Sequence, residues 1–217
     1  MTAKTLRRYT GLAPVIQMLR SQSLTLLSPL LWDDKNDAHS LERYRHSVGA
    51  KRVLALCFAE HYETYHHWKI YAPGAAGVCI EFDKQKLISA FHDLPNIRTG
   101  KVIYKTIQQL KKLHLPEKNL PFIKRFPYGD EEEFRIIYTD NKTSPFFEDF
   151  PIQLSCITRI NLSPWLSPAL DESFRESIRS IHGMEKIHIN RSKLVNYEDW
   201  KKCINIAHPL PEDEASS

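Results

Sequence analysis

The sequence predicts an α+β fold with a mixed, mostly antiparallel sheet and peripheral helices. Short apolar runs typical of strands are separated by helical segments of uneven length, and not by regular crossover helices. No Gly-rich phosphate turn follows any of these runs, which argues against a Rossmann or P-loop protein. At 217 residues and 42% hydrophobic content, the chain has the size and composition of one packed domain. We therefore expect a single α+β domain over residues 1–208 and a flexible acidic tail over residues 209–217.

In the first half of the chain, four strand-like runs alternate with four helix-like segments. Residues 12–19 carry apolar side chains at helical spacing, and Thr10 is the expected N-cap of that helix. Residues 52–59 form a nearly continuous apolar run, the pattern of a strand covered on both faces. The other expected strands are residues 6–9, 24–28 and 77–83, and the other expected helices are residues 41–48, 62–71 and 87–91. A polar loop, residues 32–37, precedes the second helix.

In the second half, strands are expected at residues 101–104, 132–138, 152–160 and 186–195, and helices at residues 108–115 and 167–182. Alternation along the strand 132–138 places Glu133, Arg135 and Ile137 on one face. Because Ile137 indicates that this face is partly covered, Glu133 is expected to lie in a cleft. The alternative is that Glu133 only forms an ion pair with Arg135 or with a lysine on a neighbouring strand.

The cellular compartment follows from the apolar runs and the cysteines. No apolar run approaches the roughly 20 residues that cross a bilayer, and the polar, basic N-terminus is not a secretory signal. The four cysteines form no CxxC pair, and Cys57, Cys79 and Cys156 lie in apolar runs, as expected of buried thiols in a reducing compartment. We expect a cytoplasmic protein without membrane contact.

Positive charge is concentrated in residues 98–125, where eight Lys and Arg residues stand against one acidic residue. Such a segment can contact nucleic acid or another phosphorylated acceptor. The alternative is a solvated helix face. The residues expected to make the contact are Lys101, Lys105, Lys111, Lys112, Lys124 and Arg125.

Several motifs occur together along most of the chain. They are Arg8-Tyr9, Ser28-Pro29, Asn36-Asp37, Trp68-x-x-Tyr71-Ala72, the segment 77–82 (Gly-Val-Cys-Ile-Glu-Phe), the strand 132–137 and the Arg-Ser-Lys-Leu at 191–194. This combination resembles a bacterial domain-of-unknown-function family, some members of which are encoded near abortive-infection, phage-defence genes. The family pattern has a proline after Asn-Asp that is missing here, which weakens any role for Asp37.

The layout of that family is in turn similar to the ADP-ribosyltransferase fold, with its split sheet. The resemblance implies an NAD-dependent ADP-ribosyltransferase or NAD glycohydrolase that acts as a phage-defence or toxin-type effector. NAD would be the substrate and no metal is expected. Breaking the nicotinamide–ribose bond builds positive charge on the ribose, which a carboxylate can stabilise and an Arg can help to position. The resemblance implies Glu133 as the catalytic residue, and Arg8, Tyr9, Ser28, Trp68, Tyr71 and Arg135 as residues that bind NAD.

Other functions remain open. One is a non-enzymatic nucleic-acid-binding or antitoxin-like partner protein of a defence operon, in which the basic segment carries the function. Another is a metal-dependent nuclease that uses scattered acids, namely Asp33, Asp34, Asp37, Glu81 and Asp83. The adjacent His66 and His67 form no recognised zinc spacing.

Overall fold

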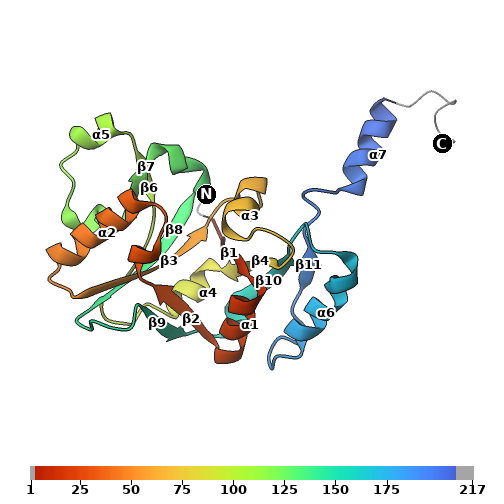
Figure 1. Cartoon of the computed structure of the whole chain (residues 1–217), viewed down its shortest axis with the longest axis horizontal. Coiled ribbons are helices and arrows are strands. Elements are labelled where there is room, and N and C mark those ends of the chain that lie inside the picture. The colour runs from red at the N-terminus through yellow and green to blue at the C-terminus, as the bar shows by residue number, and fades with distance from the viewer. Residues whose placement is uncertain (1–2, 209–217) are drawn as a thin grey trace.

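The structure is a computed structural model that describes residues 3–208, and it confirms the α+β fold (Figure 1). The strands are β1 (Thr5–Gly11), β2 (Ser23–Leu27), β3 (Arg52–Ala59), β4 (Gly77–Asp83), β5 (Ile97–Lys101), β6 (Ile103–Lys105), β7 (Ile123–Arg125), β8 (Glu133–Asp140), β9 (Phe147–Pro151), β10 (Ile157–Leu162) and β11 (Ile189–Arg191). The helices are α1 (Leu12–Ser21), α2 (Lys35–Ser47), α3 (Tyr65–Tyr71), α4 (Lys84–Ser89), α5 (Ile107–Lys111), α6 (Pro168–Arg179) and α7 (Glu198–Ala207). Short 3-10 helices are η1 (Pro29–Leu31), η2 (Glu117–Phe122), η3 (Phe126–Glu131) and η4 (Leu154–Cys156).

Nine strands form one sheet, in the order β11-β10-β4-β1-β3-β2-β9, with β8 paired to β3 and β5 paired to β8. Among the described strands, only β10–β11 and the separate pair β6–β7 are parallel. The prediction of a mixed, mostly antiparallel sheet is therefore confirmed.

The sheet is split along one edge of β3. On its other edge β3 pairs with β8 over its full length, from Arg52 to Ala59. On the split edge it pairs with β1 only at Arg7↔Ala59 and with β2 only at Leu27↔Ala55. β1 and β2 therefore diverge from β3, and the backbone of β3 between these two contacts faces an open space.

The largest cluster of buried apolar side chains lies between the sheet and helices α1, α4 and α6. It includes Phe134 and Ile136 of β8, whereas Ile137 belongs to a second cluster under α2 and η2. Both faces of β8 are thus covered, as the alternation of its sequence predicted. A third, smaller cluster surrounds Trp68 of α3.

Some boundaries differ from the sequence predictions, for local reasons. Thr10 is not the N-cap of α1, because it is still paired with Val78 in the β1–β4 ladder, and Gly11 takes the cap position. The strand expected at residues 152–160 begins only at Ile157, since η4 precedes it. The strand expected at residues 101–104 is divided between the end of β5 and the start of β6. Strands β7 and β9 and helix α7 were not predicted, and the acidic tail predicted at residues 209–217 lies outside the described residues.

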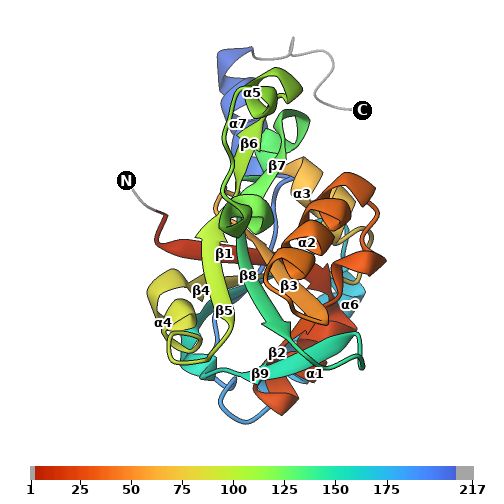
Figure 2. The ribbon, with the colours of Figure 1, turned by 90° about the vertical axis from the view of Figure 1, so that its left-hand side faces the viewer.

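Two parts of the chain extend from the body on the same side. One is the segment 103–126, comprising β6, α5, η2 and β7, which we call the arm; the other is α7 (Figures 1 and 2). None of the helices within residues 3–208 has the length and apolar character needed to span a membrane.

Candidate active site

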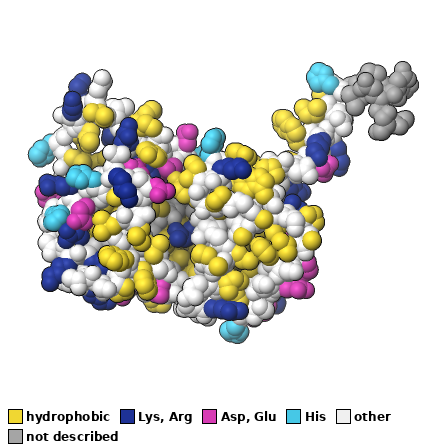
Figure 3. Space-filling model, in the orientation of Figure 1, with side chains coloured by type: hydrophobic (Ala, Val, Ile, Leu, Met, Phe, Trp, Pro, Cys, Tyr) yellow, Lys and Arg dark blue, Asp and Glu magenta, His cyan; other side chains and the backbone are white. Residues whose placement is uncertain are grey.

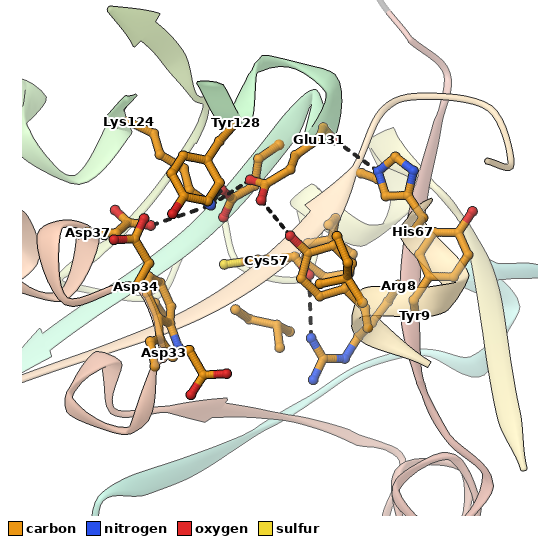
Figure 4. Close-up of a pocket in the computed structure, with 18 of the residues that line it drawn as sticks. Arg8, Tyr9, Asp33, Asp34, Asp37, Cys57, His67, Lys124, Tyr128 and Glu131 are labelled. Carbon is orange, nitrogen blue, oxygen red and sulfur yellow. Dashed lines mark hydrogen bonds and ion pairs between the residues drawn. The ribbon is translucent and has the colours of Figure 1, made fainter. Parts of the chain in front are cut away.

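The split in the sheet opens a cavity of about 630 Å³. Its floor is the unpaired stretch of β3, and its walls come from β1, the η1–α2 connection, α3, and the segment from β7 to the start of β8. Figure 4 shows Asp33, Asp34 and Asp37 on one side of this cavity, and Arg8, Tyr9 and His67 on the opposite side. The two walls therefore differ in charge.

Arg8 supplies a positive charge without an anionic partner. Its Nη1 donates to the backbone oxygen of Cys57, at 3.4 Å, which is one of the carbonyls left free by the split in the sheet. Within residues 3–208 it forms no ion pair, and burial lowers the pKa of its guanidinium. The neighbouring Arg7, in contrast, pairs with Glu81 at 3.2 Å. A desolvated cation without a carboxylate is costly unless an anion binds to it, so Arg8 is the candidate anion-binding residue of the cavity.

Glu133, at the start of β8, lines the cavity but is only 5% exposed. Its oxygens accept from Arg135 Nε at 2.7 Å and Nη2 at 2.8 Å, and from Lys124 Nζ at 3.3 Å. Burial acts to raise the pKa of Glu133, but Arg135 and Lys124 outweigh it and hold the pKa at about 2. Glu133 is therefore ionised at neutral pH. The ion pair with Arg135 that the sequence offered as an alternative is present, and it coexists with a place in the cavity wall.

Arg135 links Glu133 to Asp37. Its Nη1 donates to Asp37 at 2.8 Å and to the backbone oxygen of Pro121 at 3.0 Å, and its Nη2 also bonds to Asp37. Burial raises the pKa of Asp37, against the opposing effect of Arg135. The network joins α2, η2 and β8 beneath the cavity, so it fixes the positions of the carboxylates.

Glu131 is the second carboxylate of the cavity, and its pKa is shifted in the opposite direction from that of Glu133. It accepts from the Tyr71 hydroxyl at 2.5 Å and from Lys124 Nζ at 2.5 Å. Burial raises its pKa, and Lys124 and Tyr71 only partly offset this effect. A carboxylate with a raised pKa next to a cavity is suited to accept or donate a proton.

Aromatic rings form the wall next to Arg8. Tyr9 and His67 stack with ring centroids 5.2 Å apart, and Tyr71 lies 6.2 Å from His67. His67 is held by Thr64 through Nδ1 at 2.6 Å and approaches the Glu131 carbonyl at 3.3 Å. Burial lowers the pKa of His67, which favours the neutral imidazole, and its ring forms part of an aromatic surface. Such a surface suits a planar heterocycle.

The structure brings four of the predicted site residues, Arg8, Tyr9, Tyr71 and Glu133, to this one cavity. The other three do not line it. The Ser28 hydroxyl accepts from Leu30 N at the start of η1, Trp68 is fully buried with its Nε1 bonded to Glu63, and Arg135 lies beneath Glu133.

The predicted basic contact residues divide into two groups. Lys124 is a member of the cavity network, and Lys101 pairs with Glu60 at 3.1 Å. The remaining four lie on or beside the arm and form no ion pair within residues 3–208: Lys105, Lys111, Lys112 and Arg125.

Sequence reasoning missed Glu131, Tyr128 and the part played by Asp37. Asp37 was set aside because no proline follows it, yet it is 3% exposed and bonded to Arg135. The run of four acidic residues from Asp130 to Glu133 was a usable signal that more than one carboxylate lies near the start of β8, although Glu131 itself ends the 3-10 helix η3.

Four of the five acids considered for a metal have other partners, and Asp37 is bonded to Arg135. Asp34 caps α2, Asp83 caps α4, and Glu81 pairs with Arg7. Within residues 3–208, no three His, Cys, Asp or Glu side chains are arranged as a metal site.

Comparison with known proteins gives matches of two kinds. Over 89% of this chain and 97% of the other, the structure is similar to Thermus sp. 2.9 DarT in complex with NAD+, with 11% identity and a TM-score of 0.46. The same protein in complex with ADP-ribosylated ssDNA matches over 88% of this chain and 95% of the other, with 13% identity and a TM-score of 0.46. No curated protein matches the sequence. A family model described as "Protein of unknown function (DUF2971)" matches residues 67–144, from α3 to just beyond β8. The resemblance to a domain-of-unknown-function family that the motifs predicted is thus confirmed over residues 67–144.

Proposed function

We propose that the cavity binds NAD and cleaves the bond between its nicotinamide and ribose, transferring ADP-ribose to water or to a macromolecular acceptor. The observation that carries the proposal is the guanidinium of Arg8, which has no carboxylate partner in residues 3–208 and shares a cavity with Glu131 and Glu133. An anion site and a pair of carboxylates within one cavity suit a substrate with phosphate in one part and a cationic centre in another.

NAD has this distribution of charge. Its diphosphate would bind at Arg8 through charge-assisted hydrogen bonds, which are stronger than neutral ones. Its positively charged nicotinamide would lie toward the carboxylates, with the ring against the aromatic wall of Tyr71 and His67. The cavity of about 630 Å³ is within the size range of pockets that bind small molecules.

The two carboxylates have different chemical roles in this proposal. When the bond between ribose C1′ and the nicotinamide nitrogen breaks, its electron pair leaves with nicotinamide and positive charge develops on the ribose. Glu133, ionised at all ordinary pH values, stabilises that charge. Glu131, whose pKa is raised, accepts the proton that the attacking water or acceptor hydroxyl loses as it bonds to C1′.

The test is the release of free nicotinamide from NAD by the purified protein. Glu131→Gln and Glu133→Gln should each lower kcat by about 100-fold or more. Arg8→Met should raise KM by about 10- to 100-fold, since it removes a charged hydrogen bond to phosphate. It should not lower the melting temperature, because this guanidinium pairs with no carboxylate of the described chain.

Arg159→Met provides the matched control, because Arg159 is exposed on β10 outside the cavity. Its kinetic constants should equal those of the wild type. If the wild type neither releases nicotinamide nor binds NAD in calorimetry, the proposal is wrong.

A role as a defence effector, and a nucleic acid or protein as the acceptor, extend this proposal on the strength of the sequence resemblance. Expression of the wild type should slow bacterial growth and deplete cellular NAD or label a macromolecule with ADP-ribose, and the Glu133→Gln variant should do neither.

A further inference from the structure

The two strands of the arm meet the cavity at its carboxylates. β6 and β7 form a parallel pair outside the main sheet, in which Tyr104 lies opposite Lys124 (Figure 2). Side chains at one level of a ladder point to the same face, so these two lie side by side. The Tyr104 hydroxyl accepts from the backbone N of Glu133 at 2.9 Å, and Lys124 Nζ donates to Glu131 at 2.5 Å and to Glu133 at 3.3 Å. The strand pair therefore contacts both carboxylate residues.

The two glutamates depend on Lys124 to different degrees. Glu133 is held at its backbone by Tyr104 and by Val102 N, which donates to its carbonyl at 2.8 Å, and its carboxylate accepts two further bonds from Arg135. Within residues 3–208, the carboxylate of Glu131 accepts from Tyr71 and Lys124 alone. Loss of the Lys124 ammonium should thus change the state of Glu131 more than that of Glu133.

The charges around Glu131 disfavour its ionised form unless a cation is close. Glu131 belongs to a run of four acidic residues, 130–133, and Figure 3 shows acidic side chains gathered between the arm and α3. Burial raises the pKa of Glu131 and Glu133 adds to this effect, whereas Lys124 and Tyr71 lower it. The groups that face Glu131 from other elements are Lys124 (β7), Tyr104 (β6), Tyr71 and His67 (α3) and Glu133 (β8).

Lys124 itself stays protonated. Its Nζ lies among the carboxylates of Glu131, Glu133 and Asp37, the last at 3.8 Å, and 4.7 Å from the centre of the Tyr128 ring (Figure 4). Burial acts to lower the pKa of Lys124, but the carboxylates outweigh it and raise the pKa. Lys124 is therefore a fixed positive charge and is not suited to exchange a proton with the substrate.

We propose that Lys124 is a positioning residue for nicotinamide release: its ammonium holds the Glu131 carboxylate next to Tyr71 in the ionised form that accepts a proton. This inference rests on the proposed function, in which Glu131 is the base, and it differs from the acceptor contact that the sequence predicted for Lys124. It adds that the charge delivered by the arm determines the pH range in which the cavity is active.

The pH profile of kcat for nicotinamide release tests the role of this charge. In Lys124→Met the pKa of Glu131 should rise, so the acid limb of the profile should move to higher pH by about 1 pH unit or more. Activity lost at low pH should largely return above the new limb, while KM for NAD changes far less. Lys124→Arg keeps the charge and should return the limb toward its position in the wild type.

Two further variants separate the charge from mechanical support. Tyr104→Phe removes a hydrogen bond of the same strand pair without changing its charge, so it should lower kcat and leave the acid limb in place. A limb that moves equally in Tyr104→Phe and Lys124→Met would overturn the role of the charge. Lys118→Met, at an exposed position of η2, is the matched lysine control and should behave as the wild type.

A titration that needs no turnover keeps this inference separate from the proposed function. In protein labelled with 13C at the glutamate carboxyl groups, the NMR signal of Glu131 is identified by its absence from Glu131→Gln. Its midpoint should rise in Lys124→Met, and an unchanged midpoint would overturn the inference even if NAD is cleaved. Failure of the proposed function has its own sign, since the wild type then releases no nicotinamide at any pH. If circular dichroism shows Lys124→Met to be unfolded, Lys124→Gln takes its place, because its amide donates without a charge.

Discussion

Removal of the Arg135 guanidinium should test most directly the buried network that it forms with Glu133 and Asp37 beneath the cavity. Arg135 is fully buried, and its nitrogens bond to Glu133 at 2.7 and 2.8 Å and to Asp37 at 2.8 Å. Replacement by methionine keeps most of the side-chain volume while leaving two buried carboxylates without their main partner. We therefore expect a large loss of stability from charge rather than from packing.

The size of this loss of stability depends on which charged groups stay close to Glu133 and Asp37 after Arg135 is replaced. Removing one partner of a buried ion pair typically costs about 3–5 kcal/mol. Lys124 stays within 3.3 Å of Glu133 and 3.8 Å of Asp37, so part of the charge is still compensated. We expect a loss of about 3 kcal/mol for Arg135→Met at neutral pH and above. This is a substantial fraction of the roughly 5–15 kcal/mol that stabilises a typical domain.

The loss should also depend on pH. Without Arg135, burial dominates and the pKa values of both carboxylates in the folded variant rise above their ordinary values. The folded variant then binds protons more tightly than the unfolded chain, so its stability increases as the pH falls toward those ordinary values. The difference from the wild type should therefore be smaller at about pH 5 than at about pH 8.

Urea denaturation followed by tryptophan fluorescence at these two pH values provides the measurement. Lys201→Met is the control, because Lys201 pairs with Glu198 on the exposed surface of α7, where such pairs contribute at most about 1 kcal/mol. A loss below about 1 kcal/mol for Arg135→Met at the higher pH would refute the view that these charges form one coupled, buried unit.

Three further predictions concern single positions. The pKa of Glu133 in the folded protein, about 2, lies below its ordinary value, so ionised Glu133 contributes about 3 kcal/mol of stability above about pH 4.5 and loses this contribution as the pH falls toward 2. The stability difference between wild type and Glu133→Gln should therefore shrink over that range, and a constant difference would contradict this prediction. Gly77→Ala should destabilise by about 2 kcal/mol or more in thermal melts, since its Cβ would lie 2.2 Å from a backbone oxygen, whereas Gly129→Ala, with no atom within 4 Å, should be neutral. Tyr71→Phe removes the hydroxyl that lowers the pKa of Glu131, so the acid limb of the pH profile of nicotinamide release should move to higher pH, and an unmoved limb would exclude Glu131 as the base.

The pattern of apolar residues was sufficient to predict the elements that bury most of their side chains in the body of the protein. The continuous apolar run of residues 52–59 predicted β3 with its observed bounds, and alternation in residues 132–138 predicted that both faces of β8 are covered. Helix α7 and strand β9 were missed. Neither buries enough of its side chains on the body to leave a clear pattern, since α7 is fully exposed and β9 buries only Phe150.

The sequence by itself determined the fold class and identified four residues, Arg8, Tyr9, Tyr71 and Glu133, that the structure places in one cavity. Their functional roles stay predictions. Only the tertiary structure decided what surrounds them. Asp37 and Arg135 are 98 positions apart in the chain, so local spacing carries no information about their ion pair. The cavity itself exists because β1 and β2 each touch β3 at a single residue pair, and pairing between distant strands is a property of the assembled sheet.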